Sequence, residues 1–203
     1  MKISKLKQRS DDWFELKRGK IGGTRFSNVI SNRKNGLLYE LLNERLSPWI
    51  DNSDEYVSEE MQFGIDNEAP ARKLYSKQSG IKFEEVGAIL SDFSEIHLAS
   101  PDGVNIERGI VLEIKCTMNG AVHLARFFEG VDDKYMAQIK NYFAVSDDVK
   151  EVHFVSYCPD RHERPIIQFA FTRDMFVDDL QKWRDKVKSI EEKLNKMQLD
   201  FTF

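Results

Sequence analysis

Cysteine is scarce in this chain of 203 residues, which contains only Cys116 and Cys158. Two thiols are too few for a disulfide framework, a four-thiolate zinc site or a cysteine-ligated iron–sulfur cluster. The five prolines and eleven glycines are also too few for a disordered or collagen-like chain, and no internal repeat or linker divides the sequence. We therefore expect a single domain over residues 1–203, with a core that needs no disulfide or structural metal.

Long apolar runs are absent as well. The longest, such as residues 87–90, fall far short of the roughly 20 residues that span a bilayer, so no membrane partner is expected. The first nine residues hold lysines but no apolar stretch, which argues against a secretory signal and favours a cytoplasmic location.

An excess of positive charge is also missing. The 34 acidic residues outnumber the 30 basic residues, and the net charge is -4. This balance argues against nucleic-acid binding through bulk positive charge, but it is compatible with a local basic groove.

The N-terminal part of the chain has helical periodicity. We predict a helix over residues 11–18 with Ser10 as its cap, and a short helix over residues 24–30 with Thr24 as its cap. Leucines at helical spacing predict a third helix, which Pro48 ends: Leu37, Leu38, Leu41, Leu42 and Leu46.

A further helical stretch runs from Ser58 to Gly80, and Pro70 is expected to bend it or divide it. The remainder, up to a closing helix that Thr172 begins, alternates between strands and helices: three or four strands within residues 81–116, helices over 120–128 and 133–144, and strands over 151–157 and 165–171. This order predicts an α/β fold with a central mixed β-sheet flanked by helices.

Two acidic side chains meet on a predicted hairpin. Residues 110–116 form an apolar strand on which Glu113 and Lys115 project from the same face. A tight turn near residues 107–109 would place Asp102 within about one residue of facing Glu113. Facing carboxylates lie roughly 5 Å apart and repel each other unless a cation lies between them. Oxygen ligands of this kind suit Mg²⁺ or Mn²⁺.

Lys115 beside this pair adds a positive charge that can orient an attacking water or stabilise a pentacovalent phosphate. The three side chains together indicate metal-assisted hydrolysis of nucleic acid. Taken singly, the motifs have plainer explanations. Glu113 and Lys115 also fit an ion pair on a solvated strand face, and residues 100–103 also fit an ordinary turn. Their opposition across one hairpin is the informative feature.

A basic segment near the N-terminus suggests an anion site. Thr24 offers a hydroxyl and backbone donors at a helix start, and Lys17, Arg18 and Lys20 supply positive charge. The plainer explanation is a solvated basic helix end.

Five short motifs follow one another along the chain: W-F-E-L-K-R-G-K-I-G-G-T at 13–24, F-G-I-D-N-E-A-P-A-R at 63–72, A-S-P-D-G at 99–103, L-E-I-K-C at 112–116 and Y-M-A-Q-I-K-N-Y at 135–142. In this order they resemble the phage lambda exonuclease, or YqaJ-type viral recombinase, family within the PD-(D/E)xK nuclease superfamily. The resemblance covers nearly all of the chain, and it implies a restriction-endonuclease-like core.

The resemblance also implies a role for each matching residue on the hairpin. Asp102, Glu113 and the main-chain carbonyl of Ile114 would hold the catalytic Mg²⁺, for which Mn²⁺ would substitute. Lys115 would position or activate the water.

Two further matches lie on predicted helices. Glu68 matches a glutamate that supports the metal site, and Gln138 matches a glutamine on the helix beside the sheet. From periodicity alone, Glu68 is an exposed helix carboxylate and Gln138 an ordinary helix residue, although Tyr135, Gln138 and Tyr142 share one helix face.

By the same resemblance, Lys17, Arg18, Thr24 and Ser100 would hold the 5′ phosphate of the strand being degraded. Lys17 stands where the family has arginine, and Thr24 stands where serine is usual. Because lysine lacks the planar fork of arginine, the phosphate clamp is either Lys17 or Arg18.

The function that the resemblance implies is a Mg²⁺-dependent exonuclease, which degrades one strand of linear duplex DNA from its 5′ end and leaves 3′ overhangs for strand annealing. A ring of three subunits, a single-strand annealing protein as partner, and phage or prophage origin in the bacterial cytoplasm are implied as well. Two alternatives stay open: an endonuclease or junction resolvase with the same metal site, and a DNA-end binding protein that no longer cuts. The intact set of Asp102, Glu113 and Lys115 speaks against the second.

Overall fold

The strands form two sheets in the computed structural model, which describes residues 1–31, 34–48 and 57–202. The larger sheet has the order β4–β5–β6–β7, in which β5 and β6 are parallel and the outer pairs are antiparallel. A small antiparallel sheet has the order β1–β2–β3. The strands are β1 Lys2–Ser4, β2 Ala88–Leu90, β3 Leu98–Ala99, β4 Gly103–Asn105, β5 Ile110–Cys116, β6 Glu151–Tyr157 and β7 Ile166–Thr172.

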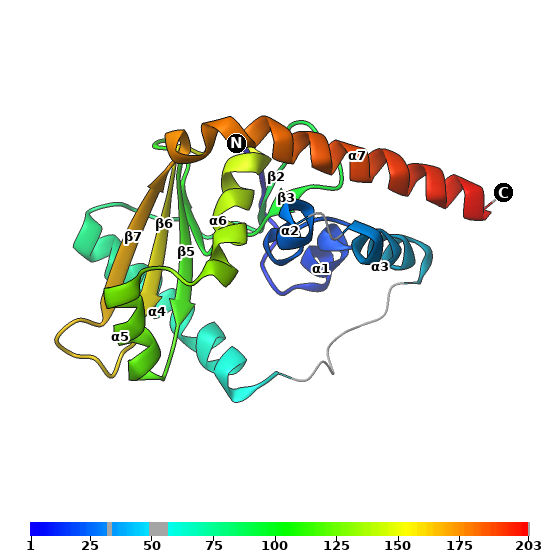
Figure 1. Ribbon diagram of the computed structural model, residues 1–203. Coiled ribbons are helices and arrows are strands. Elements are labelled where there is room, and N and C mark those ends of the chain that lie inside the picture. Colours follow the sequence, from blue (N-terminus) through cyan, green and yellow to red (C-terminus); the bar gives the residue numbers. More distant parts are fainter. Residues whose placement is uncertain (32–33, 49–56, 203) are drawn as a thin grey trace.

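Helices cover both faces of the larger sheet. In Figure 1, α4 lies at one face and α6 at the other, α1 to α3 are grouped beyond α6, and α7 runs across one end of the sheet. The helices in the described ranges are α1 Asp11–Lys17, α2 Gly23–Ile30, α3 Lys34–Leu46, α4 Glu59–Ser79, α5 Gly120–Glu129, α6 Asp133–Val145 and α7 Val177–Thr202, the last preceded by a 3₁₀ turn over Arg173–Phe176.

Strand β5 is buried on both faces because its alternate residues pack against different helices. Leu112 belongs to an apolar cluster with Tyr75 of α4. Val111, its neighbour, belongs to a second and larger cluster with Phe143 of α6. Because side chains alternate along a strand, Glu113 shares the face of Val111 and lies toward α6. The charged residues of β5 therefore project into the layer between the sheet and α6.

Most of the predicted elements are confirmed. Helix α1 begins after Ser10, whose hydroxyl accepts a hydrogen bond from the Trp13 amide at 3.4 Å. Helix α4 begins after Ser58 and ends at Gly80, which has a positive φ of 68°. This left-handed conformation is one that glycine adopts without steric cost. The mixed α/β architecture with flanking helices is also as predicted.

The expected cap of α2 was wrong, and of the two effects expected at Pro70, a bend or a division of the helix, the division does not occur. Thr24 does not cap α2: Gly22 has the extended cap conformation, and Thr24 is the second residue of the helix. Pro70 does not divide α4, which continues through it. The next turn of α4 is held by Ala71 and Tyr75, whose packing against the sheet stabilises a helix that proline alone would disfavour.

One strand and one feature of the topology were missed. Strand β1 pairs with β2, so the strands before residue 100 form a separate sheet instead of part of the central one. A strand of three residues carries too little alternation to be recognised from its pattern.

The closing helix α7 begins at Val177, four residues after the 3₁₀ turn starts.

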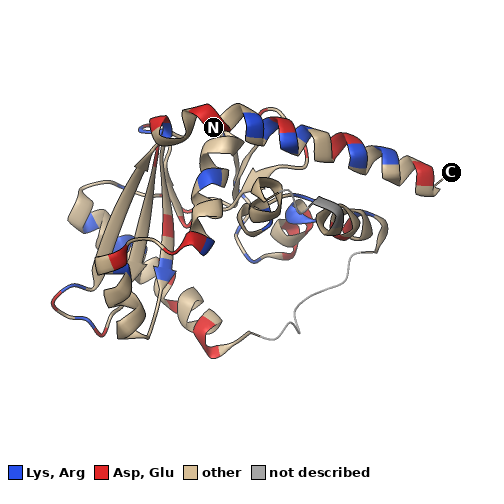
Figure 2. Cartoon of the chain, viewed as in Figure 1, with Lys and Arg blue, Asp and Glu red and all other residues tan. Residues whose placement is uncertain are grey.

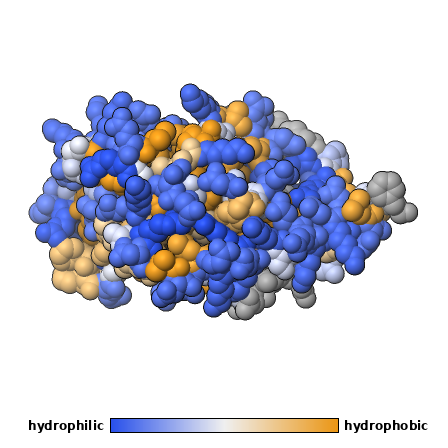
Figure 3. Space-filling model, turned by 90° about the horizontal axis from the view of Figure 1, so that it is seen from above, coloured by the Kyte–Doolittle hydropathy of each residue, from blue (hydrophilic) through white to orange (hydrophobic). Residues whose placement is uncertain are grey.

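Charges of both signs are spread over the surface. Figure 2 shows Lys and Arg interspersed with Asp and Glu along α7. Figure 3 shows a mainly hydrophilic face with scattered apolar residues. Among the described residues, no helix is both long and apolar enough to cross a membrane.

The packing of α2 generates a stability prediction. Phe26 is fully buried, stacks on His97 with 5.5 Å between ring centroids, and meets Trp183 edge-on at 6.1 Å. We expect Phe26→Ala to lower the free energy of unfolding by about 3–5 kcal/mol, because apolar burial is lost and a cavity remains. Urea denaturation followed by circular dichroism measures this. Tyr39→Ala, at a residue that is 66% exposed, is the control and should change stability by less than about 0.5 kcal/mol. Equal effects of the two substitutions would contradict the assignment of Phe26 to the core.

Candidate active site

The hairpin of β4 and β5 brings two carboxylates together. Gly103 pairs with Leu112, and the Asp102 amide donates to the Leu112 carbonyl at 3.0 Å. Continuing this antiparallel register by one residue places Asp102 opposite Glu113. The juxtaposition predicted from the turn near residues 107–109 is therefore present.

Asp102 lies in a strongly negative environment. Its Oδ2 accepts a hydrogen bond from the Ile114 amide at 2.5 Å. Burial raises the pKa of Asp102 well above its usual value, and the carboxylates of Glu113 and Glu68 raise it further, against the opposing effects of Lys115 and the Ile114 amide. Two facing carboxylates in a poorly solvated position are an arrangement that a bound divalent cation would stabilise.

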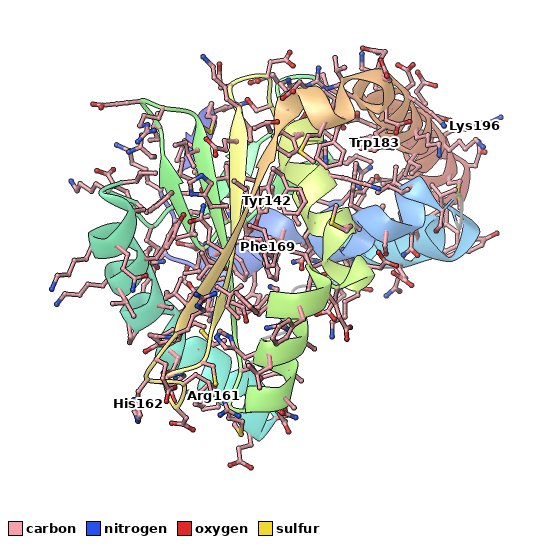
Figure 4. All side chains as sticks on the ribbon, turned by 60° about the vertical axis from the view of Figure 1, so that its left-hand side comes forward. Tyr142, Arg161, His162, Phe169, Trp183 and Lys196 are labelled. Atoms are coloured by element: carbon pink, nitrogen blue, oxygen red, sulfur yellow. The ribbon has the colours of Figure 1, made fainter. Side chains whose placement is uncertain are left out.

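Glu113 is almost completely buried, with 2% of its surface exposed, and both of its oxygens have partners. The Lys115 ammonium donates to Oε1, and the Tyr142 hydroxyl donates to Oε2. Tyr142 comes from α6 and projects toward the sheet (Figure 4), where its hydroxyl also lies 3.2 Å from the Ser100 carbonyl. Burial and the negative charges of Glu113 and Asp102 raise the pKa of Tyr142 well above its usual value, so it remains a hydrogen-bond donor.

Lys115 remains an ammonium ion in this environment. Burial lowers the pKa of Lys115, but the adjacent Glu113 and Asp102 carboxylates outweigh burial and raise it above the usual value. A charged lysine can orient a water or stabilise negative charge on a phosphate.

A buried arginine that the sequence did not point out lies behind Lys115. Arg126 of α5 is 4% exposed, and its guanidinium donates to Ser156 Oγ at 3.0 Å and lies 3.5 Å from the Lys115 carbonyl. It also faces the ring of Tyr135, whose centroid is 5.3 Å from the Lys115 ammonium. Arg126 and Tyr135 therefore form the wall against which Lys115 packs.

Glu68 reaches the same region from α4. Its side chain is 13% exposed, so it is not the exposed carboxylate that periodicity alone indicated. Oε2 pairs with Arg9 at 2.9 Å, and Oε1 lies 3.6 Å from Arg72. Arg72 also donates to the main-chain carbonyl of Asp102 and so ties α4 to the hairpin. The sequence analysis missed both arginines, although Arg72 is the last residue of the motif that contains Glu68.

A cavity of about 490 Å³ lies beside the carboxylate pair. It contains every residue that the resemblance assigned to phosphate binding: Lys17, Arg18, Thr24 and Ser100. Gln138 and Tyr142 of α6 also line it, together with the α2 start at Gly22 and Gly23. Because Tyr142 contacts Glu113 and Ser100 is two residues from Asp102, the cavity and the carboxylate pair adjoin each other.

The cavity is strongly cationic. Lys17, Arg18, Lys20 and Arg25 line it, against the single carboxylate of Glu44, which Arg25 already pairs with. The α2 N-terminus adds the partial positive charge of its helix dipole and backbone donors. Such a cavity favours an anion with several oxygen acceptors.

Two buried polar atoms in the cavity wall have no hydrogen-bond partner within the described residues. They are the NH2 nitrogen of Arg18 and the hydroxyl of Ser100. Arg18 is otherwise held by Glu15, 3.3 Å from NH1. Unpaired buried donors are costly, so their presence in one cavity points to a polar ligand there.

Gln138 of α6 lies against the start of α2. A side chain added at Gly23 would place its Cβ only 3.1 Å from Gln138 Cγ, which is tighter than ordinary packing. Gly23 therefore allows the start of α2 to lie against α6, and Gln138 becomes part of the cavity wall.

The donor set suits a hard divalent cation. Within the described ranges, no three His, Cys, Asp or Glu side chains form a metal-binding cluster. Two carboxylates and a main-chain carbonyl, from Asp102, Glu113 and Ile114, do not need a third acidic side chain. All three donors are oxygens, which Mg²⁺ and Mn²⁺ prefer.

Comparisons with known proteins agree with this site. Residues 12–148 match the sequence profile of the YqaJ-like viral recombinase domain. An alkaline exonuclease from Laribacter hongkongensis, LHK-Exo, is similar in structure, with a TM-score of 0.76 and 23% identity over 95% of this chain and 98% of that one. Its complex with dAMP matches with the same TM-score and coverage at 22% identity. No curated protein sequence matches significantly. The predicted family resemblance and fold class are therefore confirmed.

The charge on Lys17 generates a pH prediction. Burial, together with the nearby positive charges of Arg25 and Arg9, lowers the pKa of Lys17 to about 8. Because the free cavity loses this charge as pH rises through about 8, inorganic phosphate should bind more weakly above that pH. Isothermal titration calorimetry across this range measures the effect.

Lys17→Gln should bind phosphate more weakly at neutral pH and lose this step in the pH profile. Lys182→Gln, on exposed α7, is the matched control and should keep it. A step of the same size in Lys17→Gln would assign the titration to another group.

Proposed function

Since the chain belongs to the YqaJ-like viral recombinase family, we propose that it is a Mg²⁺-dependent exonuclease. It degrades one strand of linear duplex DNA from the 5′ end and leaves 3′ overhangs for recombination by strand annealing. The observation that carries this proposal is the cationic cavity with unpaired donors beside an acidic, lysine-containing hairpin. Binding of a terminal phosphate and hydrolysis of the next phosphodiester need this combination of sites.

The residues proposed to hold Mg²⁺, or Mn²⁺ in its place, are Asp102, Glu113 and the carbonyl of Ile114, with Glu68 in support. When bound, the ion supplies charge neutralisation and a more acidic coordinated water. Tyr142 keeps Glu113 in position through its hydrogen bond to Oε2.

Lys115 acts on the phosphate and the water. Its ammonium is held by Glu113 on one side and by the wall of Arg126 and Tyr135 on the other. From this position it orients the attacking water and stabilises the negative charge that develops on the phosphate oxygens. Gln138, which lines the cavity, contacts the same nucleotide.

The cavity provides the selection for chain ends. Lys17, Arg18, Thr24 and Ser100 bind the 5′ phosphate, and Arg18 has the unpaired donor nitrogen to do so. A volume of about 490 Å³ falls within the range of small-ligand sites, and it suits a terminal nucleotide better than the side of a duplex. A strand anchored by its 5′ phosphate presents its first phosphodiester to the carboxylates, so the product is a mononucleotide.

Three further elements of the proposal have less direct support: the first rests on the composition and continuity of the sequence, and the other two rest on family membership. They are a single nuclease domain over residues 1–203, a ring of three subunits around the DNA, and a single-strand annealing protein as partner. The proposed setting is a phage- or prophage-encoded enzyme in the bacterial cytoplasm.

A digest with Mg²⁺ tests the activity. Substrates are linear duplex with 5′ phosphate, linear duplex with 5′ hydroxyl, and closed circular DNA, each labelled at a defined position. We expect mononucleotides from phosphorylated linear ends and no cut in the circles. Nicked or linearised circles would identify an endonuclease, and tight end binding without cleavage in Mg²⁺ or Mn²⁺ would identify a binding protein.

Substitutions on the hairpin test the catalytic residues. Asp102→Ala and Lys115→Ala should each lower the cleavage rate by at least about a hundredfold, because a metal donor or a charge on the reacting phosphate is lost. Thermal unfolding of both variants should remain cooperative. Glu107→Ala, in the exposed turn of the same hairpin, is the control and should retain the full rate. A wild-type rate in either variant would remove that residue from the mechanism.

End preference tests the phosphate cavity. Lys17→Ala and Arg18→Ala should each reduce the ratio of cleavage rates on phosphorylated and hydroxyl ends by about tenfold, because a charge-assisted hydrogen bond to the phosphate is lost. Rates on the two substrates under single-turnover conditions give this ratio. Equal losses on both ends would argue that these side chains serve only stability or general DNA binding.

A further inference from the structure

The backbone of Arg9 is strained. Its φ of 64° makes it the one non-glycine residue with positive φ in the part of the chain that the structure describes. A side chain disfavours this left-handed conformation, whereas glycine adopts it freely. Such strain persists only where neighbouring contacts enforce it, and it is frequent at functional sites.

The residues on either side of Arg9 are fixed to the two halves of the site. The Gln8 side chain donates to the carbonyls of Pro101 and Val86, each at 2.8 Å, so it is tied to the residue just before Asp102. Ser10 caps α1, the helix that ends with Lys17. Arg9 therefore belongs to the segment that joins a contact beside Asp102 to the helix that ends at the cationic cavity.

The side chain of Arg9 extends to Glu68 on α4. Its NH2 nitrogen pairs with Glu68 Oε2 at 2.9 Å, while 44% of the side chain stays exposed. Its positive charge also contributes to the lowered pKa of Lys17 in the cavity. The contact with Glu68 uses one guanidinium nitrogen, and the planar fork of this partly exposed side chain carries further donors.

Glu68 does not depend on Arg9 alone. Arg72 lies 3.6 Å from the other carboxylate oxygen and is 12% exposed. It is held in place by the Asp102 carbonyl and by Glu85, 2.6 Å away. If the Arg9 side chain moved away from Glu68, Arg72 would remain beside the Glu68 carboxylate. This poorly solvated carboxylate would therefore keep a positively charged partner.

We infer that Arg9 is a phosphate-binding residue for the DNA strand between the cavity and the carboxylate pair, and that it exchanges Glu68 for a phosphate oxygen when DNA binds. This inference rests on the proposed nuclease function. The exchange couples two changes. The Arg9 guanidinium gains a contact with a DNA phosphate, and the Glu68 oxygen that it leaves becomes available to the proposed metal site.

Binding of 5′-phosphorylated duplex in EDTA tests the contact without cleavage. Loss of one phosphate contact lowers the slope of log K against log salt by about 0.9. Arg9→Ala should therefore bind about five- to tenfold more weakly at low salt and show this smaller slope. Arg9→Lys should keep the slope. Lys7→Ala, which removes an exposed charge two residues away, is the matched control and should leave the slope unchanged.

Thermal unfolding separates binding from a structural role. Arg9→Gly removes the same charge but relieves the left-handed strain, so its Tm should equal or exceed that of the wild type while DNA binding weakens as in Arg9→Ala. An unchanged salt slope in Arg9→Ala and Arg9→Gly, with a lower Tm, would show that Arg9 only ties the N-terminal segment to α4 and would overturn the inference.

The exchange itself predicts coupling between Arg9 and Glu68. Glu68→Gln should strengthen DNA binding in EDTA, because Arg9 is no longer held by a carboxylate. Most of this gain should vanish in the Arg9→Ala background, as a double-mutant cycle measures. Equal gains in both backgrounds would contradict the exchange. If the wild-type protein binds DNA ends and the Arg9 variants bind them with the same affinity and salt slope, the Arg9 inference alone is overturned. If the wild-type protein binds no DNA, both the nuclease proposal and this inference are overturned.

Discussion

The site depends on two like charges held face to face in a poorly solvated hairpin. Asp102 and Glu113 lie opposite each other in the β4–β5 register, and burial together with mutual repulsion raises the pKa of Asp102. Lys115 and the Tyr142 hydroxyl bind Glu113 and partly offset this repulsion. The repulsion that remains between the two carboxylates favours a bound cation. The layer between the sheet and α6 is thus arranged around this carboxylate pair.

The remaining elements bring other charges close to the carboxylate pair. Helix α4 supplies Glu68, whose negative charge is balanced by arginines from α4 and from the segment before α1. Helices α1 and α2 supply a cationic cavity, and Gly23 lets the start of α2 lie against Gln138 on α6 in the wall of that cavity. Opposite charges are therefore separated over a short distance, with an acidic part that suits a metal and a basic part that suits a phosphate.

Local pattern predicted the hairpin well and the cavity less well. The facing of Asp102 and Glu113 follows from a tight turn and a period of two, which are short-range properties of the sequence. Thr24 was placed correctly near the anion site but wrongly as a helix cap, because Gly22 fits the extended cap conformation and the position is set by packing on α6. Tyr142 could have been found from its spacing of four from Gln138. Arg9 and Arg126 could not, since their partners Glu68 and Ser156 are distant in the sequence, whereas Arg72 lies one helical turn from Glu68.

The sequence by itself determined the α/β architecture, most element bounds, the family and the carboxylate pair, because these depend on periodicity, turns and short motifs. The tertiary structure alone decided the division into two sheets, the meeting of four separate segments in one cationic cavity, and the pairing of Glu68 with Arg9. These features join residues that lie far apart along the chain. Their energies come from burial and charge at positions that only the folded chain brings together, so no local pattern encodes them.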